Sequence, residues 1–287
     1  MTRIAMLGTG AMGSRMATRL LEDGFGLTVY NRTAARSRPL LEQGAQPADS
    51  PREAVCEADV VISMVADDPA SRAVWLDSET GAIEGMRDGA LAVESSTLTA
   101  GWARQLAAEL GQRGVRFVDA PVVGSRPQAE AGALIYLAGG EACDVDELRP
   151  VLEPMAAVVH HLGAVGNGML MKLAVNAWFG IQVAALGEVL GMIEHSDVEL
   201  ARAIEIFGDL PVTSPALKAV ADQIGQRSFQ PMFPVELVEK DFRYLLETAR
   251  DLSAGTPVGE TVHDLFRRAA EKGYAGDNIS GVAQLFL

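Results

Sequence analysis

The segment RIAMLGTGAMG, residues 3–13, decides the fold of this chain. A short apolar run leads into the pattern G-x-G-x-x-G, and residues 12–22 then show a helical pattern that Gly24 is suited to end. Glycine in this pattern allows a tight turn, close approach of the backbone to a pyrophosphate, and close packing of helix on strand. The N–H groups at the helix N-terminus would bind the phosphates. The segment therefore predicts a dinucleotide site formed by Gly8, Thr9, Gly10, Ala11, Met12 and Gly13, with a glycine-rich turn that binds no ligand as the alternative.

The end of the next apolar run, residues 27–30, favours NADP over NAD as the cofactor. An NAD site has an acidic residue about 20 positions beyond the glycines, where it holds the ribose 2′-hydroxyl. Here Asn31, Arg32 and Thr33 stand at that place. Arg32 can pair with a 2′-phosphate or stack on adenine, and its two neighbours can donate hydrogen bonds. If Arg32 is instead a solvated surface residue, use of both cofactors stays open.

Short apolar runs continue through the first half of the chain and alternate with segments of helical length. The runs lie at residues 3–8, 27–30, 59–65, 90–94, 115–119, 133–138 and 158–162. This alternation predicts βαβ units and a mostly parallel sheet. Beyond about residue 168 only helical patterns follow, at residues 169–195, 199–207, 214–225, 234–251 and 256–272. We expect an α/β Rossmann-type doubly wound sheet in residues 1–163, followed by an all-α domain in residues 164–287 whose long junction helix starts near residue 168.

Composition narrows the class of protein. The 287 residues are 48% hydrophobic and 22% charged, as in ordinary folded proteins, and a net charge of −14 argues against nucleic acid or an anionic membrane as partner. Cys56 and Cys143 lie far apart in the sequence and are not spaced as a disulfide framework or a metal site would need, so we expect reduced thiols. The four histidines have no further ligands at the spacing of a metal site, so we expect no metal. We see no secretory signal. The apolar stretch 174–193 is interrupted by three polar residues, which favours a buried helix over a membrane span. The expected location is the cytoplasm.

Two further segments carry residues suited to a substrate. In DAPVVGS, residues 119–125, an apolar run ends in a turn whose N–H groups and Ser125 hydroxyl could hold a carboxylate, although an ordinary strand exit fits equally well. Lys172 and Asn176 share one face of a helix just after the glycine-rich residues 163–168. The neighbours of Lys172 are mostly apolar, and partial burial would lower its pKa toward the range where an amine exchanges protons with a hydroxyl or carbonyl.

The lysine assignment depends on its context. A lone lysine more often buries its stem and keeps its charge in water. The dinucleotide loop in the same chain is what favours a catalytic Lys172, with Asn176 holding the substrate or the lysine in line. A third segment is Lys240-Asp241, which lies within an amphipathic helical pattern. Judged by its spacing alone, this pair of adjacent charges is explained well by an exposed charged turn.

Taken in order, these segments resemble the β-hydroxyacid dehydrogenase family. That family includes 3-hydroxyisobutyrate dehydrogenases, tartronate semialdehyde reductases, and glyoxylate and succinic semialdehyde reductases, and it is related to 6-phosphogluconate dehydrogenases. The resemblance covers essentially the whole chain through the motifs GTGAMGSRM, NRT, ESST at 94–97, DAPVVGS, GAVGNGMLMKLAVN and EKDFRYLLETA.

The resemblance implies hydride chemistry with NAD(P)H and a small hydroxy acid, oxo acid or semialdehyde, without a metal. It implies that residues 8–13 and 31–33 bind the cofactor, and that Val65, Ala66 and Thr97 line its nicotinamide half. It also implies that Gly124 and Ser125 meet the substrate carboxylate, that Lys172 is the general acid/base, that Asn176 positions the substrate, and that Lys240 closes over the cofactor. A homodimer or homotetramer joined through the helical domains is the implied assembly.

One departure from the family pattern bears on the substrate. The family has serine in DAPVSG where this chain has Val123, and that serine helps to bind the carboxylate. Ser125 could take over this task, or the site could accept a more apolar compound. Two other functions remain open. One is an imine reductase of the same fold, against which Lys172 argues, and the other is a non-catalytic NADP-binding interaction module.

Overall fold

The computed structural model describes residues 2–287 and divides the chain into two compact units. The first unit extends to Lys172 and the second runs from Leu173 to Leu287. The boundary falls inside helix α8 (Asn167–Glu194), so a single helix carries the chain from one unit into the next.

The first unit is built on a parallel sheet in the order β3-β2-β1-β4-β5-β6. Its strands are β1 (Arg3–Leu7), β2 (Gly26–Tyr30), β3 (Gln46–Pro47), β4 (Val60–Ser63), β5 (Leu91–Glu94) and β6 (Arg116–Asp119). The strand order reverses between β1 and β4, and in such sheets ligands bind beyond the carboxyl ends of the strands at this switch point. The predicted Rossmann-type doubly wound sheet, with an all-helical unit after it, is confirmed.

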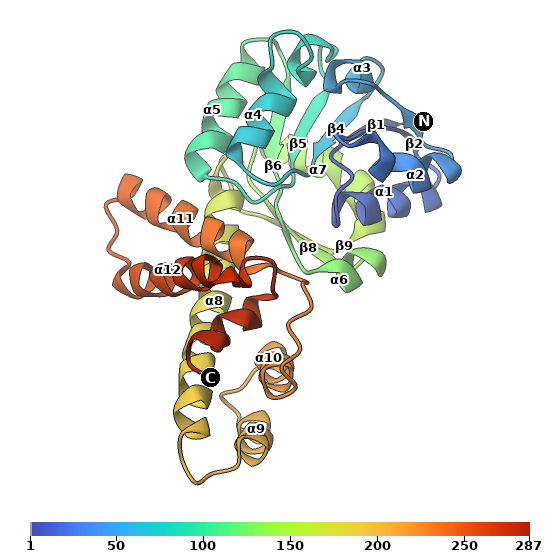
Figure 1. The fold of residues 1–287 in the computed structure, drawn as a ribbon. Coiled ribbons are helices and arrows are strands. Elements are labelled where there is room, and N and C mark those ends of the chain that lie inside the picture. The colour runs from blue at the N-terminus through green and yellow to red at the C-terminus, as the bar shows by residue number, and fades with distance from the viewer. Residues whose placement is uncertain (1) are drawn as a thin grey trace. The chain divides into compact units, whose positions relative to one another are not determined.

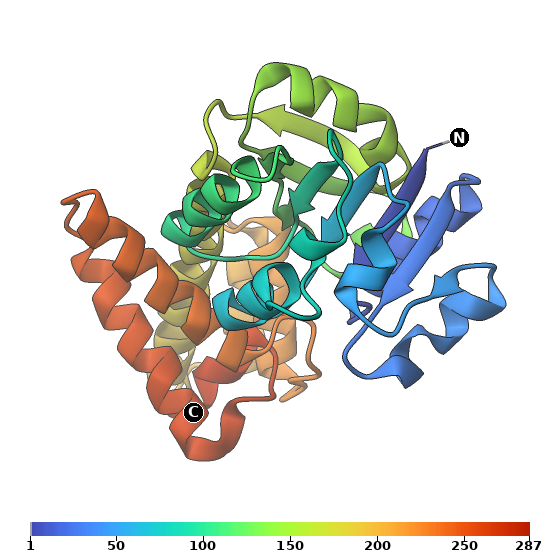
Figure 2. The ribbon, with the colours of Figure 1, turned by 90° about the horizontal axis from the view of Figure 1, so that it is seen from above.

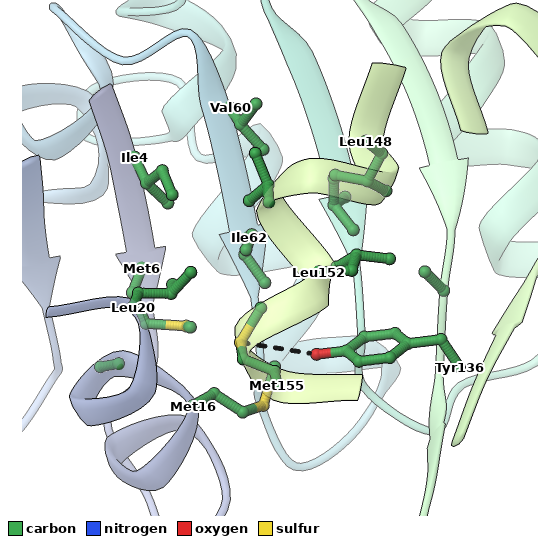
Figure 3. Packing of buried hydrophobic residues seen from close by; sticks show 14 of the residues in the cluster. Ile4, Met6, Met16, Leu20, Val60, Ile62, Tyr136, Leu148, Leu152 and Met155 are labelled. Atoms are coloured by element: carbon green, nitrogen blue, oxygen red, sulfur yellow. Dashed lines mark hydrogen bonds between the residues drawn. The ribbon is translucent and has the colours of Figure 1, made fainter. Parts of the chain in front are cut away.

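Successive side chains of β1, β4, β5 and β6 pack on opposite faces of this sheet, and helices cover both faces (Figures 1 and 2). Ile4 and Met6 face α1 (Gly13–Glu22) and α7 (Ala142–Leu152), and Figure 3 shows them beside Ile62 of β4. Ala5 and Leu7 face the other way, toward α3 (Pro51–Val55), α4 (Asp68–Leu76) and α5 (Ala100–Gly111). Burial on both faces explains why these strands are apolar without alternation.

The remaining strands of the first unit form a smaller sheet in the order β7-β8-β9. It consists of β7 (Val122–Val123), β8 (Leu134–Ala138) and β9 (Ala156–His161). The short helix α6 (Arg126–Glu130) and Gly132, at φ +63°, reverse the chain, so β8 runs antiparallel to β7. The sequence predicted strands near 133–138 and 158–162 but not their separation from the main sheet.

Short helices complete the first unit. They are α2 (Arg38–Glu42), η1 (Ala34–Ser37), η2 (Ala82–Glu84) and η3 (Glu153–Met155). Beside η3 the Tyr136 hydroxyl points at the sulfur of Met155, 3.6 Å away (Figure 3).

The second unit is helical throughout its described elements. It contains most of α8 followed by α9 (Leu200–Asp209), α10 (Pro215–Gly225), α11 (Val235–Asp251), α12 (Pro257–Ala269), η4 (Ala270–Tyr274) and η5 (Ile279–Leu285). Helices α11 and α12 lie side by side (Figure 2), and the rings of Phe242 and Phe266 stack with centroids 5.7 Å apart. Gly180 allows α8 to approach α11 closely, because a Cβ at this position would lie 2.5 Å from the Phe242 ring.

Helix α8 is long and apolar enough to cross a membrane by length and composition, but half of its most apolar window is buried inside the protein. This burial fits the prediction of a core helix.

Candidate cofactor and active site

The glycine loop lies directly after β1, at the carboxyl edge of the main sheet. Gly8 has φ +102°, and its N–H donates to the Tyr30 carbonyl at 2.8 Å. A Cβ on Gly13 would lie 2.0 Å from the Gly8 carbonyl oxygen, so this glycine permits the close contact of helix and strand. A Cβ on Gly10 would meet nothing within 4 Å. The middle glycine therefore faces open space, which is where a phosphate would approach.

The N-terminus of α1 is available to an anion. Its N-cap residue, Met12, makes no side-chain hydrogen bond, and the first turn holds no acidic residue. The positive end of a helix dipole is an ordinary feature of a phosphate site. The glycine loop and the start of α1 therefore have a geometry that would suit a dinucleotide phosphate.

Asn31 connects the two cofactor segments to each other. Its Oδ1 accepts a hydrogen bond from the Thr9 N–H at 3.0 Å, and its Nδ2 donates to the Thr33 carbonyl at 2.9 Å. The Thr9 hydroxyl also contacts the Ser37 hydroxyl at 3.0 Å. Asn31 thus holds the glycine loop against the segment that would select the cofactor.

A cavity of about 720 Å³ opens beside the glycine loop. Thr9, Gly10 and Ala11 line one side of it, and Arg36 from η1 lines another. Sequence reasoning missed Arg36, although it stands four residues beyond Arg32 in the same cofactor-selecting segment. Both guanidiniums are exposed. They give this part of an acidic protein two positive charges where a 2′-phosphate would lie.

The loops after β4 and β5 contain Val65, Ala66 and Thr97. They lie at the same carboxyl edge as the glycine loop, because β4 is paired with β1 and β5 with β4. Glu94, the last residue of β5, is fully buried, and burial raises the pKa of its carboxyl above its ordinary value. Sequence reasoning placed the ESST run here but assigned no task to this glutamate.

The predicted carboxylate-binding turn follows β7. Gly124 is exposed with φ +129°, and Val123 pairs with Ile135 in the small sheet. The Ser125 N–H donates to Gln128 Oε1 at 2.9 Å in a capping box at the start of α6. A bound carboxylate would compete with this bond for the Ser125 N–H. The Gly124 N–H is therefore the simpler donor.

Arg126 follows directly in the chain. Its Nε is buried without a hydrogen-bond partner among the residues that the structure describes. A buried guanidinium N–H without a partner costs free energy, so it favours an anionic ligand.

Asp119, at the end of β6, organises the start of α8. Its Oδ1 accepts the Gly166 N–H at 2.7 Å and its Oδ2 accepts the Met169 N–H at 2.9 Å. Two glycines make room for the carboxylate: a Cβ on Gly139 would lie 2.6 Å from Oδ1, and one on Gly168 would lie 2.8 Å from Oδ2. Asp119 thus fixes the first turn of the helix that carries Lys172. The sequence suggested only a strand end at this position.

The environment of Asp119 predicts a pH-dependent stability. Burial raises the pKa of Asp119 to about 7, against the opposing effects of the two N–H bonds and the nearby Arg104 charge. Because the folded state holds this proton more tightly than the unfolded chain, the contribution is favourable at low pH and is lost as pH rises through 7. Relative to Asp119→Asn, the wild type should lose about 3 kcal/mol of unfolding free energy between about pH 5 and about pH 8. Urea unfolding across this range measures it, and a pH-independent difference would contradict it.

Lys172 and Asn176 occupy successive turns of α8, and both are buried, with 8% and 9% of their surface exposed. Asn176 Nδ2 donates to Asp241 Oδ2 at 2.6 Å, and Lys240 Nζ lies 3.2 Å from Asp241 Oδ1. Lys240 Nζ also lies 5.1 Å from the centre of the Tyr244 ring. The alternative of an exposed charged turn for Lys240-Asp241 is wrong, because both side chains are buried. Asp241, to which the sequence assigned no task, joins Asn176 and Lys240 in one cluster.

The histidines form no metal site within residues 2–287, where no group of three or more potential ligands occurs. His160 and His161 lie inside β9, and the His161 ring contacts the Gly140 carbonyl at 2.8 Å. The His263 ring contacts Glu239 Oε1 at 2.8 Å.

Comparison with known proteins matches both halves of the chain to related enzymes. The model of the NAD binding domain of 6-phosphogluconate dehydrogenase matches residues 3–163, and that of the NAD-binding domain of NADP-dependent 3-hydroxyisobutyrate dehydrogenase matches residues 166–286. These ranges meet a few residues before the division between the compact units.

Individual proteins are similar over almost their full length. Glyoxylate/succinic semialdehyde reductase 1 of Arabidopsis thaliana is 31% identical over 281 residues, covering 98% of this chain and 97% of that protein. NAD-dependent L-serine dehydrogenase of Pseudomonas aeruginosa is 31% identical over 293 residues, covering 100% and 98%. The structure of Mycobacterium tuberculosis 3-hydroxyisobutyrate dehydrogenase with L-serine is 27% identical, covers 99% of both chains and has a TM-score of 0.90. The chain therefore belongs to the β-hydroxyacid dehydrogenase family and is an NAD(P)-dependent oxidoreductase acting on hydroxyl or carbonyl groups of small molecules.

Proposed function

We propose that this enzyme uses NADP and moves a hydride between the nicotinamide and a small carboxylate-bearing hydroxy acid, or its oxo-acid or semialdehyde counterpart. Lys172 is the general acid and base, and Asn176 positions the substrate. The observation that carries the proposal is the burial of the Lys172 amine near the start of α8, in a chain whose glycine loop fits a dinucleotide.

The bound nicotinamide supplies or accepts the hydride. During reduction, the Lys172 ammonium donates a proton to the oxygen of the substrate carbonyl as negative charge develops there. During oxidation, the neutral amine removes the hydroxyl proton. Burial strengthens both tasks, because charge interactions are stronger away from water. Lys240, which lies in one cluster with Asp241 and Asn176, is a further residue that we expect to contact the cofactor.

The preference for NADP is supported by the positive charges of Arg32 and Arg36 beside the glycine loop. It is also supported by Asn31, which stands where an NAD site has an acidic residue. Arg36→Glu should weaken NADPH binding about 10- to 100-fold by removing one charge-assisted contact, and should leave NADH binding nearly unchanged. Fluorescence titration with each cofactor measures the change. Arg38→Glu is the matched control, since Arg38 is exposed and already paired with Glu42 at 3.7 Å. Equal losses in both variants would contradict a specific role for Arg36.

A carboxylate on the substrate is supported by the Gly124 N–H, the Ser125 hydroxyl and the Nε of Arg126. A protein with net charge −14 needs such local positive charge to hold an anion. The named substrates of the relatives, glyoxylate, succinic semialdehyde and L-serine, all carry a carboxylate. The family serine at position 123 helps to bind the substrate carboxylate, and in this chain Arg126 would take over that contact.

A substrate panel tests the proposed function. NADPH consumption with glyoxylate, succinic semialdehyde and other small oxo acids should exceed that with cyclic imines of similar size. Turnover of imines alone would favour an imine reductase, and tight NADPH binding without any turnover would favour a non-catalytic binding module.

The assembly we propose is a homodimer or homotetramer in the cytoplasm. Helix α8 exposes Met171, Trp178, Val189 and Met192, with 67% of Trp178 and 68% of Met192 accessible. Exposed apolar side chains along one helix are typical of a protein interface. Sedimentation velocity measures the assembly.

A further inference from the structure

The loops that follow β4 and β5 are tied to each other by hydrogen bonds. The Val65 N–H donates to Ser96 Oγ at 2.7 Å. One turn further, the Thr99 N–H and hydroxyl donate to the two oxygens of Asp68 at 3.1 and 2.7 Å. The conformation of each loop therefore depends on the other.

Glu94 anchors this pair of loops from beneath. Its Oε1 accepts the Ser96 N–H at 3.1 Å, and the Ser96 hydroxyl is also hydrogen-bonded to the Glu94 carboxyl. Its Oε2 accepts the Ser71 hydroxyl at 2.7 Å and the Trp75 Nε1–H at 2.9 Å, both from α4. Glu94, Ser96, Ser71 and Trp75 are all completely or almost completely buried. A continuous chain of contacts thus runs from α4 through Glu94 and Ser96 to Val65.

The position of these hydrogen bonds along the sheet edge indicates which part of the cofactor lies near them. A dinucleotide crosses the carboxyl edge at the switch point between β1 and β4. The glycine loop, Asn31 and Arg32 lie on the β1–β2 side, where the adenosine phosphates belong. Val65, Ser96 and Thr97 lie on the β4–β5 side, which leaves them the nicotinamide half.

We propose that Glu94 and Ser96 are positioning residues, which hold Val65, Ala66 and Thr97 in the conformation that receives the nicotinamide half of the cofactor. This inference rests on the proposed function. Neither residue touches the cofactor itself. Ser96 fixes the Val65 N–H, and Glu94 fixes Ser96 relative to α4.

Two serines allow a matched test. Ser71 and Ser96 are both fully buried, and both hydroxyls bond to Glu94, but only Ser96 reaches Val65. Ser96→Ala should weaken NADPH binding about tenfold, the effect of one lost buried hydrogen bond. It should leave the affinity for 2′-phospho-ADP-ribose, which lacks the nicotinamide, nearly unchanged. Ser71→Ala should weaken NADPH binding less than Ser96→Ala, because the Trp75 Nε1–H still holds Glu94 to α4, and it should spare 2′-phospho-ADP-ribose. Calorimetric titration of each variant with both ligands measures this.

Glu94→Asp provides a second variant, because it withdraws the carboxyl by one methylene while keeping its chemistry. It should also weaken NADPH and spare 2′-phospho-ADP-ribose. The inference is overturned if Ser96→Ala and Ser71→Ala lose equal affinity, if both ligands weaken together, or if neither ligand weakens. Wild-type protein that binds neither ligand would instead remove the proposed function, so the two failures are distinguishable.

Discussion

Lys172→Ala should lower kcat for carbonyl reduction about 10²- to 10⁴-fold, the usual contribution of a positioned general acid, with some further loss of charge stabilisation. NADPH affinity should stay nearly unchanged, because the cofactor phosphates would bind at the glycine loop after β1, whereas Lys172 lies on α8, whose first turn is held by Asp119 at the end of β6. Steady-state turnover and NADPH titration measure the two quantities separately.

Two variants sharpen this prediction. Lys172→Arg keeps the positive charge but cannot release a proton near neutral pH, so it should stay almost as slow as the alanine variant. Lys272→Ala removes an exposed lysine in η4 and should behave as wild type. Wild-type turnover in Lys172→Ala would end the assignment of the general acid.

Alanine at two glycines of the same loop should give opposite phenotypes. Gly13→Ala places a Cβ 2.0 Å from the Gly8 carbonyl oxygen, so the strand and α1 must separate and the protein should lose several kcal/mol of stability. Gly10→Ala meets no protein atom within 4 Å and should fold normally. It should nevertheless lose most of its NADPH affinity, because the methyl group enters the space of the pyrophosphate. Thermal melting with and without NADPH separates the two outcomes.

Gly111→Ala is the control for this pair, since its Cβ also meets nothing within 4 Å and it lies at the end of α5, away from the glycine loop. It should retain both stability and cofactor binding. Normal NADPH affinity in Gly10→Ala would show that the open space at Gly10 is not a phosphate site.

The sequence predicted the parts of the fold that depend on local pattern. Alternating apolar runs and helical segments predicted the parallel sheet, and the long periodic segments of the second half predicted helices that the structure places within a few residues, such as α10 (Pro215–Gly225). The separate β7-β8-β9 sheet was not predictable in this way. It depends on a reversal at Gly132 and on pairing between residues distant in sequence.

The candidate site shows the same division. The glycine loop and Lys172 were visible as candidates because their residue types and spacing suit a dinucleotide and a proton transfer. Asp119, Glu94 and Asp241 were not, because each acts through partners that only the folded chain brings near it. Arg36 was within reach of sequence reasoning, since it follows Arg32 in the same segment, but its place at the cavity needed the structure.

The double hydrogen bond of Asn31 sets a limit on engineering this enzyme toward NAD. The obvious exchange, Asn31→Asp, would keep an oxygen for the Thr9 N–H but would turn a second oxygen against the Thr33 carbonyl, where the amide now donates. The acid that recruits a free ribose hydroxyl would thus loosen the turn that cradles the phosphates. Redesign should begin at Arg32 and Arg36, whose exposed side chains can change without disturbing that turn.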